Sequence, residues 1–164
     1  MVAYNHADGS YLKQMKNLLP NLRKDFPDIT FVQADKFYWS PKDQTVYYDQ
    51  SKKDKPAVWA LIHELSHGLL SHKTYKTDFE LLQLEVAAWD EAKNVANRYK
   101  ITIDEEHVQD CLDTYRDWLH ARSKCPSCGE HGLQDKSGTY QCINCDSTWH
   151  VSSERFCRPY RRKA

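Results

Sequence analysis

The sequence has no long apolar segment, no recognisable targeting signal and no net charge at neutral pH. Its longest apolar run, residues 57–62, is far shorter than the roughly 18–20 residues that a membrane span needs. Residues 1–11 have neither the basic start nor the apolar stretch of a secretory signal peptide. We therefore expect a cytoplasmic protein with no membrane partner.

Internal repeats and low-complexity tracts are also missing from the 164 residues, a length that suits one ordinary domain and a small appendage. The zero net charge hides an uneven distribution. Residues 1–121 carry 15 Lys and Arg against 19 Asp and Glu, whereas residues 122–164 carry 8 against 4. The basic C-terminal part indicates an acidic partner for that region.

Hydrophobic periodicity predicts an α+β fold, with a small antiparallel sheet packed on helices. The expected helices cover residues 11–22, 57–71, 77–99 and 104–119, and the expected strands cover 29–34, 36–39 and 44–48. Pro20 is expected to kink or divide the first helix. The helix at 57–71 is apolar nearly all round, which predicts that it is buried.

The strongest functional motif in the sequence, His63-Glu64-Leu65-Ser66-His67, lies on this buried helix. Residues four apart share a helix face, so His63 and His67 can bind one zinc ion while Glu64 reaches the metal-bound water. Zinc makes that water acidic enough to attack a carbonyl near neutral pH, and the glutamate takes and returns the proton. Without a metal, these buried polar groups would cost several kcal/mol.

A catalytic zinc has three protein ligands and one open position, and the third ligand is sought on the next helix. Glu80 completes a capping box with Thr77, and Glu91 lies nearly opposite Glu85 on the helix. Glu85 lies within the apolar stripe, where a carboxylate needs a cation. Glu85 is therefore the predicted third ligand, in a gluzincin-type arrangement, with a metal-free buried ion pair as the alternative. His72 is expected near the helix end, beside the site.

The segment HELSHGLLSH at residues 63–72, followed by Glu85-Val-Ala-Ala88, resembles the ImmA/IrrE-like metallopeptidase family. Members typically show HELGH-x-LLGH and then a helix with E-x-x-A spacing, and the strand at residues 45–48 fits the same layout. The resemblance covers about residues 30–100. It implies an intracellular zinc peptidase that cleaves a regulatory protein, such as a repressor or an antitoxin-like partner. Ser66 departs from the usual glycine, and a cysteine-rich module follows where many relatives have a DNA-binding domain or nothing.

That cysteine-rich module contains two Cys-x-x-Cys pairs, Cys125 with Cys128 and Cys142 with Cys145. Two such pairs separated by 13 residues predict a four-cysteine structural zinc site. Short strands expected at 132–134 and 138–141 make the module a zinc ribbon, and the metal supplies much of the stability of so small a unit. A pair of redox-active dithiols is the alternative.

These motifs predict three parts: a zincin-like metallopeptidase domain at 1–121, a zinc ribbon at 122–150 and a basic C-terminal tail at 151–164. The tail carries aromatic residues between its basic ones, a pattern that can bind phosphates and stack bases. A solvated chain end is the simpler interpretation of the same residues. The candidate nucleic-acid or partner contacts are Arg155, Arg158, Arg161 and Arg162.

The predicted function is a zinc-dependent endopeptidase that acts on a protein or peptide substrate, with one catalytic and one structural zinc ion. One alternative is a SprT-like protease acting on DNA-bound proteins, since that family also joins a HExxH helix to a zinc ribbon, though its third ligand is usually histidine. Another is a non-catalytic regulator that binds nucleic acid or protein. Tyr47, Tyr48 and Tyr99 are open choices for the transition-state donor, and the sequence indicates no oligomeric state.

Overall fold

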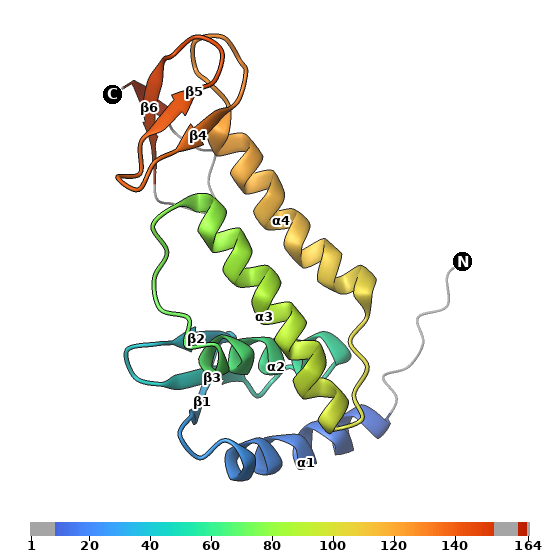
Figure 1. Ribbon diagram of the computed structural model, residues 1–164. Helices are drawn as coiled ribbons and strands as arrows, with labels where there is room; N and C mark the ends of the chain where they lie inside the picture. The colour runs from blue at the N-terminus through green and yellow to red at the C-terminus, as the bar shows by residue number, and fades with distance from the viewer. Residues whose placement is uncertain (1–8, 153–160, 164) are drawn as a thin grey trace, which may run out of the picture. The chain divides into compact units, whose positions relative to one another are not determined.

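A computed structural model describes residues 9–152 and 161–163 of the chain (Figure 1). Its described helices are α1 (Gly9–Asp25), α2 (Lys55–Leu69), α3 (Asp78–Arg98) and α4 (Glu105–Ser123). The first three strands are β1 (Thr30–Ala34), β2 (Tyr38–Ser40) and β3 (Thr45–Asp49). The remaining strands are β4 (Gly132–Gln134), β5 (Tyr140–Cys142), β6 (Thr148–Val151) and β7 (Arg161–Lys163). The predicted α+β class is confirmed, and none of the described helices is long and apolar enough to cross a membrane.

The chain forms two compact units, Met1–Lys73 with Ala87–His107, and Thr74–Val86 with Val108–Ala164. Helix α3 is continuous and contributes its beginning to the second unit and its remainder to the first. The division into a domain at residues 1–121 and another at 122–150 stays a prediction.

The sheet of the first unit is mixed, so the prediction of an antiparallel sheet is wrong for one of its two strand pairs. Its strand order is β1-β3-β2, with β2 antiparallel to β3 but β1 parallel to it. The central strand is also the most buried, with Val46 fully buried and Tyr48 7 % exposed. Because β3 is the central strand, β1 pairs with β3 and not with β2, its neighbour in the sequence, and the pairing is parallel.

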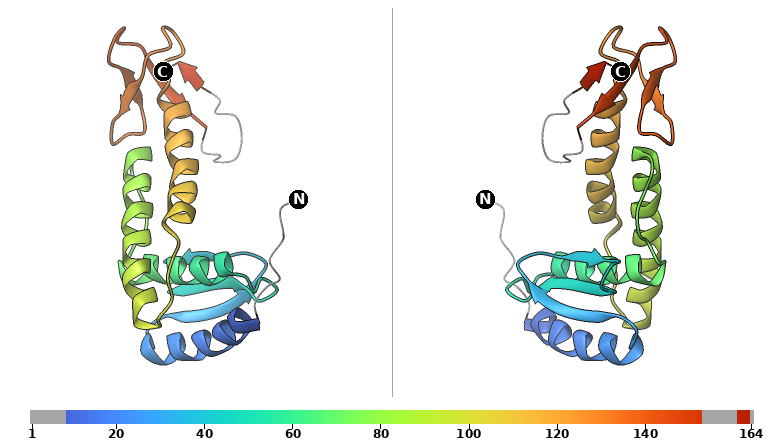
Figure 2. Two further views of the ribbon diagram at one scale, coloured as in Figure 1. Left: turned by 90° about the vertical axis from the view of Figure 1, so that its right-hand side faces the viewer. Right: turned by 90° about the vertical axis from the view of Figure 1, so that its left-hand side faces the viewer.

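Helix α2 is the buried helix of the first unit, as predicted, and it packs against β2 and β3. It begins after Asp54, whose carboxylate accepts a hydrogen bond from the main-chain N–H of Ala57 at 3.1 Å. Val58, Leu61, Ile62 and Leu65 have no exposed surface. Leu19 of α1, Leu61 of α2 and Tyr48 of β3 line one cavity, so both helices lie on the same face of the sheet. Helix α1, the blue helix of Figure 2, continues through Pro20 without being divided. The motif helix is therefore held within the core of its unit.

The second unit is built on a four-stranded antiparallel sheet with the order β4-β5-β6-β7. Its core consists of Cys125, Tyr140, Cys142 and Trp149. The rings of Tyr140 and Trp149 stack with their centroids 5.3 Å apart. The strands β4 and β5 match the two predicted ribbon strands, and the core is small enough to need further support from a metal or from buried polar contacts.

Candidate metal centres

His63 and His67 lie one turn apart on α2, and both side chains are buried, with 6 % and 9 % of their surface exposed. Their Nε2 atoms are 3.1 Å apart, so the two lone pairs point to a common place. Two imidazoles on a tetrahedral zinc, with Zn–N distances of about 2.0–2.1 Å, place their nitrogen atoms about 3.3 Å apart. The spacing of the two histidines therefore fits a shared metal ion.

Glu85 on α3 completes this group. One ligand atom from each of His63, His67 and Glu85 lies within 4.8 Å of the others, and the Glu85 side chain is only 6 % exposed. One turn further along α3, the Trp89 ring stacks on the His63 imidazole with a centroid distance of 4.2 Å. The structure thus brings together the three predicted ligands, and two imidazoles with one carboxylate are a donor set that suits zinc.

Glu64 follows His63 on α2 and faces strand β2. One oxygen of its carboxylate, Oε2, accepts a hydrogen bond of 2.8 Å from the main-chain N–H of Trp39. This bond orients a half-buried carboxylate beside the two histidines. The strand edge and the metal-binding helix are therefore joined at the residue predicted to act as the general base.

The other residues considered for the third ligand make different contacts. Glu80 forms the capping region of α3: its N–H donates to Thr77 Oγ1 at 3.1 Å, and its carboxylate accepts from the N–H of Lys76 at 2.7 Å. The carboxylate of Glu91 accepts a hydrogen bond from Asn94 Nδ2 at 3.0 Å. His72 lies beside the ligands, with its Nδ1 2.9 Å from Nδ1 of His67.

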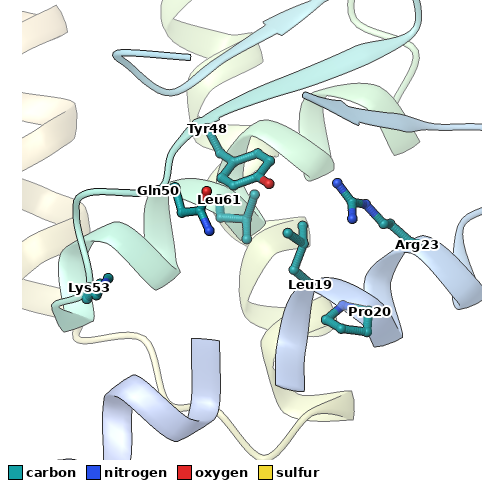
Figure 3. A pocket seen from close by; sticks show the side chains of 7 residues that line it. All are labelled: Leu19, Pro20, Arg23, Tyr48, Gln50, Lys53 and Leu61. Atoms are coloured by element: carbon teal, nitrogen blue, oxygen red, sulfur yellow. The ribbon is translucent and has the colours of Figure 1, made fainter. Parts of the chain in front are cut away.

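The three tyrosines proposed as transition-state donors are also engaged elsewhere. Tyr47 stacks on Tyr38 with ring centroids 4.4 Å apart, and the hydroxyl of Tyr99 donates to Asp25 at 2.7 Å. Burial and this bond to Asp25 raise the pKa of Tyr99 to about 12. Tyr48 lines a separate cavity of about 250 Å³ together with Leu61 (Figure 3). None of these contacts identifies a donor.

The Figure 3 cavity lies on a different face of α2 from the metal ligands. Leu61 precedes His63 by two residues, a rotation of about 200° on a helix. The remaining lining residues come from α1 and from the loop after β3, and they are Leu19, Pro20, Arg23, Gln50 and Lys53. The cavity is therefore distinct from the candidate metal site.

The four ribbon cysteines form the second candidate metal centre. Their Sγ atoms all lie within 4.8 Å of one another, with Cys125 and Cys145 at 3.7 Å and Cys128 and Cys142 at 3.5 Å. Four thiolates on a tetrahedral zinc, with Zn–S distances of about 2.3 Å, have sulfur atoms about 3.8 Å apart. The spacing of the sulfur atoms is therefore compatible with a shared zinc ion.

Main-chain hydrogen bonds favour a thiolate at Cys125, whereas burial and the sulfur atoms of Cys145 and Cys142 raise the pKa of Cys128 to about 11. Burial opposes ionisation of Cys125, but main-chain N–H groups of Cys128 and Ser127 donate to its sulfur and lower its pKa to about 6. The N–H of Asn144 similarly lies 3.4 Å from the sulfur of Cys142. Such N–H groups stabilise the negative charge that metal-binding sulfur carries.

A buried ion pair, which the sequence alone did not indicate, supports the ribbon. Asp78, at the start of α3, accepts hydrogen bonds from Arg122 Nε at 2.5 Å and from the Tyr140 hydroxyl at 2.6 Å. The main-chain N–H of Asp78 also donates to Gln134 Oε1 at 2.7 Å. At the end of α4, the carbonyl of Arg122 accepts a bond of 3.1 Å from the indole of Trp149. Asp78 and Arg122 therefore bind Tyr140 and Trp149, two side chains of the core of the second unit.

The basic C-terminal residues are only partly described. The segment Arg161–Lys163 forms β7, whose main chain pairs with β6 in the register Val151 with Arg161 and His150 with Arg162. Arg155 and Arg158 lie outside the described residues. Nucleic-acid or partner binding by these arginines stays a prediction.

Comparison of the chain with protein-family models, with curated proteins and with solved structures found no match. The two clusters of donor atoms are thus the features of the molecule from which its function has to be inferred. Both clusters are compatible with zinc.

Proposed function

We propose that this chain is a zinc-dependent endopeptidase with an ImmA/IrrE-like metal site, in which His63, His67 and Glu85 bind the catalytic zinc and Glu64 is the general base. The convergence of these three buried side chains beside a HExxH glutamate carries the proposal. Three protein ligands leave one position open for a reacting group, as in catalytic zinc sites. A second, structural zinc is proposed for Cys125, Cys128, Cys142 and Cys145.

Each residue of the site has a distinct part in peptide hydrolysis. When bound, zinc supplies Lewis-acid chemistry and lowers the pKa of water. Glu64 then accepts a proton from the attacking water and returns it to the leaving amine. The main-chain N–H of Trp39 donates to the Glu64 carboxylate at 2.8 Å and holds it in one orientation. The amide keeps its own hydrogen and takes no part in the proton transfer. His63 and His67 would hold the metal through their Nε2 atoms.

The position of β2 supports an extended polypeptide as the substrate. In the described sheet, β2 pairs with β3 alone, and its outer edge reaches Glu64 through the N–H of Trp39. An exposed strand edge can bind an extended peptide through main-chain hydrogen bonds. A peptide bound beside β2 would pass the general base. By the resemblance in its sequence, the substrate is a regulatory protein.

A protease for DNA-bound proteins is the second candidate function. The basic strand β7 on the ribbon sheet favours it, because Arg and Lys bind phosphates. Glu85 at the metal site favours the first candidate, because the SprT-like pattern usually has histidine in this role. If the second candidate is right, full-length protein should bind DNA in a salt-sensitive manner and lose that binding when Arg161 and Arg162 become alanine.

The test of catalysis is the substitution Glu64→Gln, which removes the base but keeps the size of the side chain and its ability to accept the Trp39 hydrogen bond. Proteins that disappear in cells with the wild-type chain should persist in cells with Glu64→Gln, while the bound zinc is unchanged. Glu80→Gln is the matched control, because Glu80 lies at the α3 cap. Equal protein levels in wild-type and Glu64→Gln cells, and no cleavage by purified protein, would contradict the proposal.

A further inference from the structure

We propose that the C-terminal cap of α2 positions the metal ligand His67, and that His72 is the residue which holds its imidazole in place. This inference rests on the proposed zinc site. His72 is assigned as a positioning residue, since it acts through His67 and does not belong to the group of ligands.

The end of α2 has the hydrogen bonds of a Schellman motif. Helix α2 ends at Leu69, and Ser71 adopts a left-handed conformation with φ of 55°. The N–H of Ser71 donates to the Gly68 carbonyl at 3.0 Å, and the N–H of His72 donates to the His67 carbonyl at 3.0 Å. These are the 5→2 and 6→1 bonds that define the motif. The motif folds the chain back, so that His72 lies over His67.

The same motif usually brings together two apolar side chains at these positions. Here the two side chains are imidazoles, with Nδ1 atoms 2.9 Å apart and ring centroids at 5.0 Å. Nε2 of His67 faces Nε2 of His63, so a metal bound between them would take the Nε2 lone pair of His67 and leave its hydrogen on Nδ1. His67 therefore donates to Nδ1 of His72, and this bond fixes both the tautomer and the ring orientation of the ligand.

The cap is itself held by Trp39 of β2. The indole Nε1 of Trp39 donates to the carbonyl of His72 at 3.0 Å, and its main-chain N–H donates to Glu64. The ring packs so closely on Gly68 that a Cβ there would lie 3.0 Å from Cζ3 of Trp39. One strand residue thus contacts the helix cap, the residue beside the metal ligand and the general base.

The spacing of the two histidines agrees with this geometry. Residues five apart on a continuous helix are turned by about 140° and do not meet. His67 and His72 meet because the helix ends between them and the chain reverses at Ser71. The sequence Leu69-Leu70-Ser71-His72 therefore encodes a positioning contact and not an additional metal ligand.

The experiment measures zinc affinity of the full chain with the ribbon zinc retained, by competition with a chelator. His72→Ala should weaken zinc binding at the site of His63, His67 and Glu85 about 10- to 100-fold, the usual effect of losing a partner of a metal-bound histidine. His72→Asn should restore most of the affinity, because its amide oxygen can accept the His67 hydrogen bond near the place of Nδ1. Lys73→Ala, an exposed neighbour, should leave affinity unchanged.

Cobalt placed at the site of His63, His67 and Glu85 gives an independent readout of its geometry. Its visible absorption should shift in His72→Ala and return toward wild type in His72→Asn. Unchanged affinity and spectrum in a folded His72→Ala chain would overturn the proposal, and so would equal losses in the alanine and asparagine variants. If His72→Ala does not fold, Trp39→Phe, which loses the indole N–H to the His72 carbonyl and part of the ring that packs on Gly68, must show a smaller shift of the same sign.

Failure of this inference differs from failure of the proposed function. A wild-type chain that binds no zinc at His63, His67 and Glu85 would contradict both. If the wild-type chain binds zinc there and the His72→Ala variant binds it equally well, the positioning role alone is contradicted and the peptidase proposal stands.

Discussion

The buried ion pair between Asp78 and Arg122 is predicted to be the main polar support of the ribbon. Both side chains are only 6 % exposed, and the carboxylate accepts hydrogen bonds from Arg122 Nε and from the Tyr140 hydroxyl. Asp78→Asn keeps the shape of the side chain but leaves the guanidinium of Arg122 as a buried charge without its counter-ion. Breaking such a pair from one side costs about 3–5 kcal/mol.

The loss of stability expected for Asp78→Asn can be distinguished from the smaller loss expected for a single hydrogen bond. A domain of ordinary stability has about 5–15 kcal/mol to lose, so Asp78→Asn should remove a large fraction of it. Tyr140→Phe, which removes one hydrogen bond to the same carboxylate, should cost about 1 kcal/mol. Replacing both charges, as in Asp78→Leu with Arg122→Met, should be less harmful than Asp78→Asn alone, because no buried charge remains.

The assay is urea unfolding of the zinc-loaded chain, followed by the rate of zinc release to a chromogenic chelator. The matched control is Asp113→Asn, since Asp113 and Arg116 form an exposed ion pair at 2.7 Å. Exposed pairs of this kind contribute at most about 1 kcal/mol. A loss for Asp78→Asn no larger than that of Asp113→Asn, with unchanged zinc release, would refute the reasoning.

Three further predictions concern single residues of the first unit. Gly68→Ala should destabilise the chain by about 1 kcal/mol in urea unfolding, because its Cβ would lie 2.9 Å from Ile29 Cδ1, and Ile29→Val should relieve part of this loss. Ser71→Gly should stabilise it by about 0.5–1 kcal/mol in thermal unfolding, because glycine adopts the left-handed conformation without strain; a loss would contradict this. The pKa of Tyr99 is raised by burial and by Asp25 from 10.0 to about 12, so its stabilising contribution is complete below pH 10 and is lost as the pH rises through 12. Unfolding free energies of wild type and Tyr99→Phe should therefore converge between pH 10 and 12, and a constant difference would count against this.

The metal ligands could be predicted from the sequence because their spacing follows directly from helix geometry. His63 and His67 are separated by one turn, and Glu85 is a carboxylate within an apolar helical stripe. The apolar residues around each of them in the sequence predict that their side chains are buried. The cysteine ligands could also be predicted from the sequence, since the two cysteines of each Cys-x-x-Cys pair are close together in the chain. In both cases the structure brings the predicted donor atoms together.

Features that depend on long-range packing could not be predicted in this way. The parallel pairing of β1 with β3 depends on which strand becomes central, and periodicity gives the strands without their order. The Asp78–Arg122 pair joins residues 44 positions apart, and neither residue has an apolar periodicity that marks it as buried. His72 was expected near the metal ligands. Its contact with His67 depends on the left-handed backbone conformation of Ser71, which the sequence does not predict.

The central claim is that the chain carries a catalytic zinc site of His63, His67 and Glu85 in addition to the ribbon, and the zinc content of purified variants tests it most directly. The account predicts two zinc ions per wild-type chain and one for Glu85→Ala, with the ribbon zinc retained. It also predicts one for Cys125→Ser, provided that the His and Glu group stays folded. A wild-type chain that holds a single zinc, lost in Cys125→Ser and unaffected in Glu85→Ala, would contradict the claim.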